Sequence, residues 1–297
     1  MSSQTDRARD TPYVEHVLTL PGRGEIFFRE CRENAGAPTL FLLHGLGATG
    51  LLNWRSALDA LARRYRVLVV DHRGHGRGIA TRAPFRLADC ADDVAALADA
   101  LEIPSFFAAG YSMGGPIAQL LWHRHPTRVE GLVLCATAAR FSSPEARRLA
   151  FLASPSLRVF GRLAPRDTIR RRALEYVSDQ LDDPGIRDRV LEEVAQSDPV
   201  AIGQAAAAVL RFDSHGWIHE VDVPTAVVLT ERDGMVHPSA QRALADRLRD
   251  TRIYPVDADH AACRTAPKAF VPALTEACAS VVERADAGRR APRFAAD

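Results

Sequence analysis

The sequence predicts an α/β fold with a doubly wound, mostly parallel sheet and an inserted helical cap. Two observations favour this class. Short apolar runs of strand character alternate with helical patterns along most of the 297 residues, as they do where helices connect parallel strands. Runs such as Leu40–Leu43 and Val67–Val70 are apolar at every position, which is typical of strands covered on both faces. The length accommodates one large domain with a modest insertion.

Eight strands and five helices are predicted for the core. The strands are residues 15–20, 25–32, 39–43, 66–71, 105–109, 129–136, 224–230 and 251–256. The helices lie near residues 53–64, 87–101, 114–124, 238–249 and 267–284. The first two strands are close enough in sequence to form an antiparallel hairpin. The third to sixth strands are the near-continuous apolar runs, and a helix is expected after each of them except the sixth.

The alternation stops between residues 140 and 218. That segment keeps helical periodicity, is interrupted by prolines and has no strand pattern. Because it stands between the sixth and seventh strands, it is predicted to be a helical cap over the carboxyl ends of the sheet, where open α/β sheets bind ligands. The core is assigned to residues 13–139 and 219–286, and flexible termini to residues 1–12 and 287–297.

The most specific local pattern is Gly110-Tyr111-Ser112-Met113-Gly114. It joins an apolar strand run to a helical pattern, which is the context that a nucleophile elbow requires. A serine on such a sharp turn presents its hydroxyl above the sheet edge, and glycines leave room for the turn because they carry no Cβ. The free N–H groups and positive dipole end of the next helix face the same point. Ser112 is therefore the candidate nucleophile.

A serine hydroxyl needs a base to take its proton and an acid to orient that base. Two later strands end in suitable residues, because the seventh leads into Asp233 and the eighth leads into His260. Ser112, Asp233 and His260 follow the order nucleophile, acid and base that this architecture imposes. The rival acids, weighed below Asp233, are Glu231, Asp257 and Asp259.

Backbone donors for a developing oxyanion are expected on two loops. The strand 39–43 ends in a glycine-rich turn, residues 44–47, which can present the N–H of Leu46. The second donor is expected to be the N–H of Met113, the residue after the nucleophile. His44 is expected to brace the first loop rather than to act as a base.

Composition and spacing exclude several classes of function. A net charge of +1 offers no basic surface for nucleic acid, and no apolar run is long enough to span a membrane. The polar N-terminus shows no secretory signal. The five cysteines are odd in number and lack metal-ligand spacing, so they indicate reduced thiols in a cytoplasmic protein without a metal site. The glycine-rich turn 71–76 lacks both the P-loop and the dinucleotide-binding spacing, so we interpret it as structural.

Together these residues resemble the α/β-hydrolase fold family. The matching pieces, in order over residues 39–262, are His44–Gly47, Asp71–Gly76, Gly110–Gly115, Asp233 and His260. The resemblance implies a central eight-stranded, mostly parallel sheet, a cap after the sixth strand, and no metal or organic cofactor. Dehalogenases and epoxide hydrolases of this family carry Asp at the nucleophile position, so Ser112 argues against both activities.

By the same resemblance we expect a serine hydrolase that cleaves a carboxylic ester of a small or medium-sized molecule through an acyl-enzyme. Lactonases, C–C bond hydrolases, thioesterases and perhydrolases use the same catalytic set, and a non-turnover ligand-binding member is a further alternative. The substrate and the oligomeric state are left open. Arginines are dense in the cap, where nearby acids favour a solvated, self-neutralising surface over a site for an acidic substrate. Candidate pocket residues, chosen for motif or cap position, are Trp54, Tyr111, Phe141, Phe151, Phe160, Trp217 and Met235.

Overall fold

The computed structural model describes residues 13–31, 36–81, 83–143 and 184–290. Within these residues one sheet has the strand order β1-β2-β4-β3-β5-β6-β7-β8. Its strands are β1 Val14–Leu20, β2 Gly24–Cys31, β3 Thr39–Leu43, β4 Arg66–Val70, β5 Phe106–Tyr111, β6 Val129–Cys135, β7 Thr225–Thr230 and β8 Thr251–Val256. β2 runs antiparallel to β1 and β4, and every other pair is parallel. The predicted sheet is confirmed.

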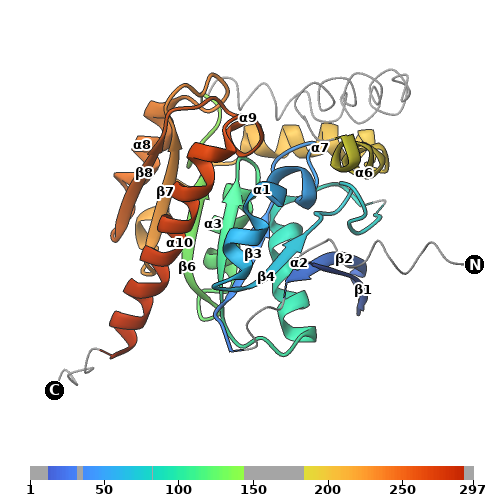
Figure 1. Cartoon of the computed structure of the whole chain (residues 1–297), viewed down its shortest axis with the longest axis horizontal. Helices are drawn as coiled ribbons and strands as arrows, with labels where there is room; N and C mark the ends of the chain where they lie inside the picture. The colour runs from blue at the N-terminus through green and yellow to red at the C-terminus, as the bar shows by residue number, and fades with distance from the viewer. Residues whose placement is uncertain (1–12, 32–35, 82, 144–183, 291–297) are drawn as a thin grey trace, which may run out of the picture.

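Helices cover both faces of the sheet (Figure 1). The helices on one face are α1 Gly50–Ala62, α9 Ala262–Thr265 and α10 Pro267–Arg290. Those on the other face are α2 Leu87–Ala100, α3 Gly114–Arg124 and α8 Pro238–Ala245. Along β3, Leu40 and Leu42 belong to the core layer between the sheet and α1, α9 and α10. Phe41 and Leu43 belong to the core layer on the other face, between the sheet and α2, α3 and α8. Alternate side chains point to opposite faces of a strand, which explains why these strands are apolar throughout.

Two further helices and a short 3₁₀ helix belong to the chain between β6 and β7. They are α6 Pro184–Ala195, α7 Pro199–Arg211 and η2 Ile218–Glu220. In Figure 1, α6 and α7 lie at the same end of the molecule as α9. Residues 144–183, which include the pocket candidates Phe151 and Phe160, lie outside the described residues. The cap boundaries, 140 and 218, therefore stay predictions.

Helix ends differ most from the sequence prediction. α1 begins at Gly50, because the Thr49 hydroxyl accepts a 3.2 Å hydrogen bond from the N–H of Leu52 and caps the helix. α10 extends to Arg290, so residues 287–290, assigned to a flexible terminus, continue this helix. The four-residue α9 was not predicted. None of the helices in the described ranges combines the length and apolar character that crossing a membrane requires.

Candidate active site

Ser112, Asp233 and His260 meet just beyond the carboxyl ends of β5, β7 and β8. His260 Nε2 lies 2.9 Å from Ser112 Oγ, and His260 Nδ1 lies 2.7 Å from Asp233 Oδ2. Both distances fall within the reach expected for a nucleophile, a base and the group that orients the base. β5 and β7 lie on either side of β6, β8 pairs with β7, and all four strands run parallel. Residues far apart in sequence therefore meet at the same edge of the sheet.

The turn that carries Ser112 requires glycine on both sides. Ser112 has a φ of 51°, in the left-handed region that residues other than glycine rarely adopt. A Cβ on Gly110 would lie 2.2 Å from the Gly114 carbonyl oxygen, and a Cβ on Gly114 would lie 2.1 Å from that of Leu43. The Thr137 hydroxyl donates a 2.8 Å hydrogen bond to the Ser112 carbonyl oxygen. The strained turn is therefore held by close packing and a side chain of the β6 loop.

Asp233 is buried and accepts hydrogen bonds at both carboxylate oxygens. Oδ1 accepts the N–H groups of Met235 and Val236, each at 2.8 Å. Oδ2 accepts the Thr230 hydroxyl at 2.8 Å in addition to the His260 ring. Burial tends to raise the pKa of Asp233, but the hydrogen bonds and the His260 charge outweigh it and hold that pKa below its usual value. The carboxylate is thus kept ionised beside the histidine.

The rival acids near His260 have other partners. Asp259 accepts the N–H of Ala261 at 2.9 Å and the Thr265 hydroxyl at 3.1 Å, so it shapes the turn after β8. Asp257 is exposed and pairs with Arg232 at 2.9 Å. In contrast, only Asp233 among the described carboxylates is hydrogen-bonded to the His260 ring.

The loop after β3 is braced by His44. Its Nδ1 lies 2.8 Å from the Gly45 carbonyl oxygen, and its Nε2 accepts the N–H of His72 at 2.9 Å. The ring must therefore be neutral with its proton on Nδ1. Burial lowers the pKa of His44 to about 4, against a smaller opposing effect of the Gly45 contact. This arrangement agrees with a bracing role and leaves His44 no free nitrogen for proton transfer.

The N–H groups of Leu46 and Met113 remain available. In the described part of the chain neither donates a hydrogen bond to a protein acceptor. Gly45 lies beside the nucleophile, since a Cβ built on it would be 3.3 Å from Ser112 Cβ. Met113 is fully buried and stands just before α3, where unpaired N–H groups and the positive dipole end favour a negative charge. The arrangement can stabilise an oxyanion that forms on a carbon attacked by Ser112 Oγ.

Known proteins share this fold. A model of the alpha/beta hydrolase fold matches residues 38–267. The chain belongs to the α/β-hydrolase family. A pimeloyl-[acyl-carrier protein] methyl ester esterase from Neisseria meningitidis serogroup B is 31% identical over 253 residues, which cover 82% of this chain and 95% of the relative. The sequence-based expectations of this family and of a hydrolase acting on ester bonds are confirmed.

Two solved structures are also similar to this chain. A hydrolase from Pseudomonas aeruginosa PA01 has a TM-score of 0.75 and 26% identity, covering 89% of this chain and 98% of its own. The enol-lactonase from Burkholderia xenovorans LB400 has a TM-score of 0.73 and 26% identity, covering 90% of this chain and 100% of its own. This hydrolase therefore matches both proteins over nearly their full length.

The five pocket candidates that the structure describes lie in different parts of this α/β hydrolase. Trp54 and Tyr111 are buried in the core, where their rings pack edge to face. Phe141 is partly buried and packs against the core layer on the α2, α3 and α8 face of the sheet. Trp217 stacks on His123 near the C-terminal end of α3, away from the N-terminal end that adjoins Ser112. Met235 is 74% exposed, two residues from Asp233, so it alone of the five combines exposure with proximity to the catalytic set.

Sequence reasoning missed two buried amides. Gln241 of α8 contacts the loop of Asp233, accepting the Thr230 N–H at 3.1 Å and donating to the Val236 carbonyl oxygen at 2.8 Å. Asn53 of α1 accepts the Gly45 N–H at 2.7 Å. Each stands on an otherwise apolar helix face, for example that of Gln241 and Leu244. A polar residue on a core-facing stripe was the available signal.

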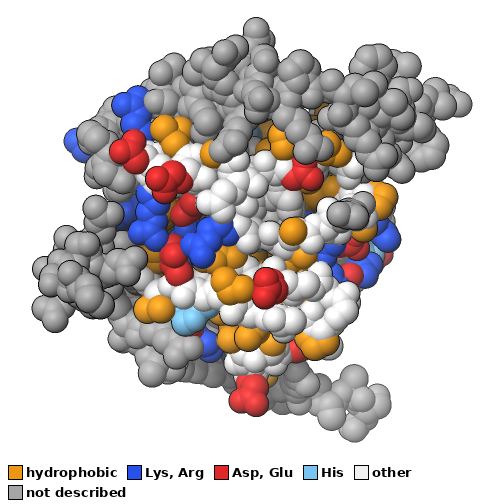
Figure 2. Space-filling model, turned by 90° about the vertical axis from the view of Figure 1, so that its right-hand side faces the viewer, with side chains coloured by type: hydrophobic (Ala, Val, Ile, Leu, Met, Phe, Trp, Pro, Cys, Tyr) orange, Lys and Arg blue, Asp and Glu red, His pale blue; other side chains and the backbone are white. Residues whose placement is uncertain are grey.

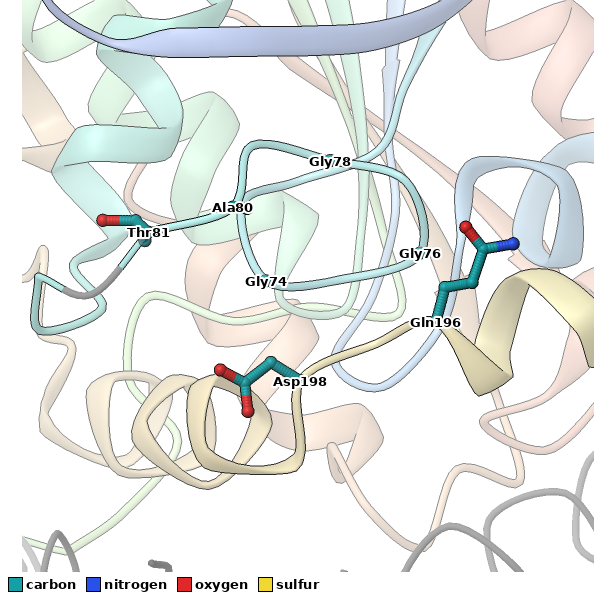
Figure 3. Close-up of a pocket in the computed structure, with 7 residues that line it drawn as sticks. All are labelled: Gly74, Gly76, Gly78, Ala80, Thr81, Gln196 and Asp198. Atoms are coloured by element: carbon teal, nitrogen blue, oxygen red, sulfur yellow. The ribbon is translucent and has the colours of Figure 1, made fainter.

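The glycine-rich turn after β4 is hydrogen-bonded to the connection between α6 and α7. The Asp198 N–H donates to the Gly74 carbonyl oxygen at 2.9 Å, and the Gly76 N–H donates to the Ser197 hydroxyl at 2.9 Å. A cavity of about 380 Å³ remains between the turn and the α6–α7 connection, with Gln196 and Asp198 on its far side (Figure 3). The interpretation of this turn as structural agrees with these contacts.

Charge on the described surface is mixed. On the face drawn in Figure 2, basic side chains lie beside acidic ones. Ion pairs such as Arg77–Glu15 at 2.8 Å and Arg124–Asp92 at 2.7 Å illustrate this neutralisation. Among the described residues, no group of three His, Cys, Asp or Glu side chains is arranged to hold a metal ion.

Proposed function

We propose that this protein is a serine hydrolase that cleaves a carboxylic ester of a small or medium-sized molecule through an acyl-enzyme, with Ser112 as nucleophile, His260 as base and Asp233 as orienting acid. The observation that carries the proposal is the continuous relay from Ser112 Oγ to His260 Nε2 and from His260 Nδ1 to Asp233 Oδ2, at 2.9 and 2.7 Å. Relatives that are esterases and lactonases support the same reaction class.

The proposed reaction proceeds in two displacements. His260 Nε2 takes the Ser112 proton as Oγ attacks the ester carbonyl carbon, and the carbonyl oxygen becomes an oxyanion near the N–H groups of Leu46 and Met113. His260 then gives its proton to the leaving alkoxide, which departs as the alcohol. A water molecule, deprotonated by His260, attacks the acyl-enzyme in the same way and releases the acid and free Ser112. Asp233 stays ionised throughout and stabilises the imidazolium.

Methyl esters are the first substrates to test, because the Neisseria relative is named for a methyl ester. A lactonase is the second candidate, since one similar structure is an enol-lactonase. Hydrolysis of a lactone uses the same steps but retains the alcohol in the product. A panel of methyl esters of increasing acyl length, p-nitrophenyl esters and five- and six-membered lactones separates the two by kcat/KM.

Labelling with a fluorophosphonate, followed by intact mass, tests the mechanism without knowledge of the substrate. The probe requires an activated serine and oxyanion donors. We expect one adduct on the wild type and none on Ser112→Ala, and a fall in ester turnover of roughly 10⁴–10⁶-fold in the variant. An unlabelled wild type, or a loss of turnover below tenfold in the variant, would contradict the proposed mechanism.

We further propose a cytoplasmic location. All five cysteines are buried and form no disulfide, which suits a reducing compartment. Isolation of the protein with unmodified thiols from a cytoplasmic fraction would support this location, whereas recovery outside the cell would oppose it.

A further inference from the structure

Asn53 connects the two loops that flank the nucleophile. It lies in the first turn of α1 and is 2% exposed. Its Oδ1 accepts the Gly45 N–H at 2.7 Å, and its Nδ2 donates toward Cys263 Sγ at 3.3 Å. Gly45 belongs to the loop of Leu46, and Cys263 follows His260 in the next turn of chain. One buried amide thus contacts both loops.

The contact with Gly45 bears on the direction of the Leu46 N–H. The peptide unit between Gly45 and Leu46 is planar and trans, so its C=O and N–H point in opposite directions. The Gly45 carbonyl oxygen lies 2.8 Å from His44 Nδ1 and accepts the Ala48 N–H at 3.3 Å. Asn53 accepts the Gly45 N–H, which belongs to the peptide unit between His44 and Gly45. Both peptide units around Gly45 are therefore anchored, which matters because glycine itself restrains its backbone least.

We propose that Asn53 is a positioning residue that aims the Leu46 N–H at the oxyanion formed on the substrate. The inference rests on the proposed function, because it assumes that Leu46 is an oxyanion donor. Asn53 contacts no reacting atom and acts through the Gly45 backbone. Loss of its amide leaves the buried Gly45 N–H without its acceptor and lets the loop rotate away from the orientation that the transition state needs.

Ser56 offers a matched control on the same helix. Its hydroxyl donates a 2.8 Å hydrogen bond to the Cys263 carbonyl oxygen. Ser56→Ala therefore removes a contact between α1 and the chain after His260 but leaves the loop of Leu46 untouched. Cys263→Ala is a second comparison, because it removes the Sγ partner of Asn53 while keeping the Gly45 hydrogen bond.

The test compares Asn53→Ala, Ser56→Ala and Cys263→Ala with the wild type, using p-nitrophenyl butyrate turnover and the rate of fluorophosphonate labelling per folded enzyme. We expect kcat and the labelling rate of Asn53→Ala to fall about 10–100-fold, since small misplacements of donors cost about two orders of magnitude. KM should change less than about threefold, because the donor acts mainly in the transition state. A trifluoromethyl ketone inhibitor should lose affinity in parallel with kcat. Ser56→Ala should retain wild-type kcat.

Two outcomes would overturn the inference. One is an unchanged kcat in Asn53→Ala, whether or not KM rises. The other is an equal loss in Asn53→Ala and Cys263→Ala, which would assign the effect to the chain after His260. A wild type that is not labelled at Ser112 instead defeats the proposed function. In that case amide exchange at Gly45 and Leu46 still decides whether Asn53 anchors the loop, because unchanged exchange in Asn53→Ala would exclude it.

Discussion

The Tyr111 hydroxyl donates a 2.7 Å hydrogen bond to the His260 carbonyl oxygen. Tyr111 directly precedes the nucleophile, and its ring also packs edge to face on the His260 ring at 6.0 Å. Burial raises the pKa of Tyr111 well above its usual value, so the hydroxyl keeps its proton and remains a donor. The residue beside the nucleophile therefore holds the base in place.

Tyr111→Phe should lower kcat about 3–10-fold and leave KM nearly unchanged. The ring still fills its space in the core, but the His260 carbonyl oxygen loses its donor, a net cost of about 0.5–1.5 kcal/mol. We expect Tm to fall by roughly 2–4 °C. Steady-state kinetics and a thermal melt measure both effects. A variant with wild-type kcat would show that the ring packing alone positions His260.

Asp233→Asn should lower kcat by about 10³–10⁴-fold. The Met235 and Val236 N–H groups both donate to Oδ1 and cannot reverse, so the amide oxygen of Asn must face them. Its NH₂ group then faces His260 Nδ1 and forces the ring proton onto Nε2, the atom that must accept the Ser112 proton.

Glu231→Gln is the matched control for Asp233→Asn, because Glu231 follows the same strand and pairs only loosely with Arg242 at 3.7 Å. Its kcat should stay within about twofold of the wild type, as is usual for exposed ion pairs. Equal losses in the two variants would show that the acid is not specifically Asp233.

The outline of the molecule was predictable because its signals are local. β3 shows this, since Leu40 and Phe41 reach opposite core layers and make the run apolar throughout. The positions of Ser112, Asp233 and His260 could be inferred because each follows a recognisable strand. Asn53 and Gln241 could not, because their partners are backbone groups of other elements. Trp217 was selected for its place in sequence, yet the 11-residue α3, about 16 Å long at 1.5 Å per residue, separates its His123 partner from Ser112.

The buried histidines should make the protein sensitive to mild acid. Burial lowers the pKa of His44 to about 4, that of His75 to about 3, and that of His72 well below 6.5. Asp71 faces His75 and opposes its shift. Between pH 6.5 and about 4 these histidines bind protons in the unfolded chain but not in the folded chain. The free energy of unfolding therefore decreases as pH falls, by up to about 1.4 kcal/mol per pH unit for each histidine.

Thermal melts from pH 7 to 5 should therefore show a falling Tm, and His75→Gln should flatten this slope. His125→Gln is the control, because His125 is half-buried at the end of α3 and pairs with Asp92. Equal slopes in both variants would contradict the assignment to the buried rings.

The Arg29–Glu193 ion pair should stabilise the packing of α6 against the core. Arg29 of β2 is fully buried and also lies 3.2 Å from Glu15 and 3.9 Å from Asp71. Burial raises the pKa of Glu193 to about 7, although Arg29 acts in the opposite direction. Glu193→Ala should destabilise the protein by roughly 1–3 kcal/mol, less than for an isolated buried pair because Arg29 keeps two carboxylates.

The effect of Glu193→Ala should be local. Amide exchange should speed up in α6 and α7 before it does in the central strands, because these helices rest on the turn after β4 and contribute few contacts to the sheet. Glu192→Gln, an exposed change on the same helix, should leave exchange unaltered. If Glu193→Ala accelerated exchange equally in α6 and β5, the pair would support the whole fold rather than the attachment of α6.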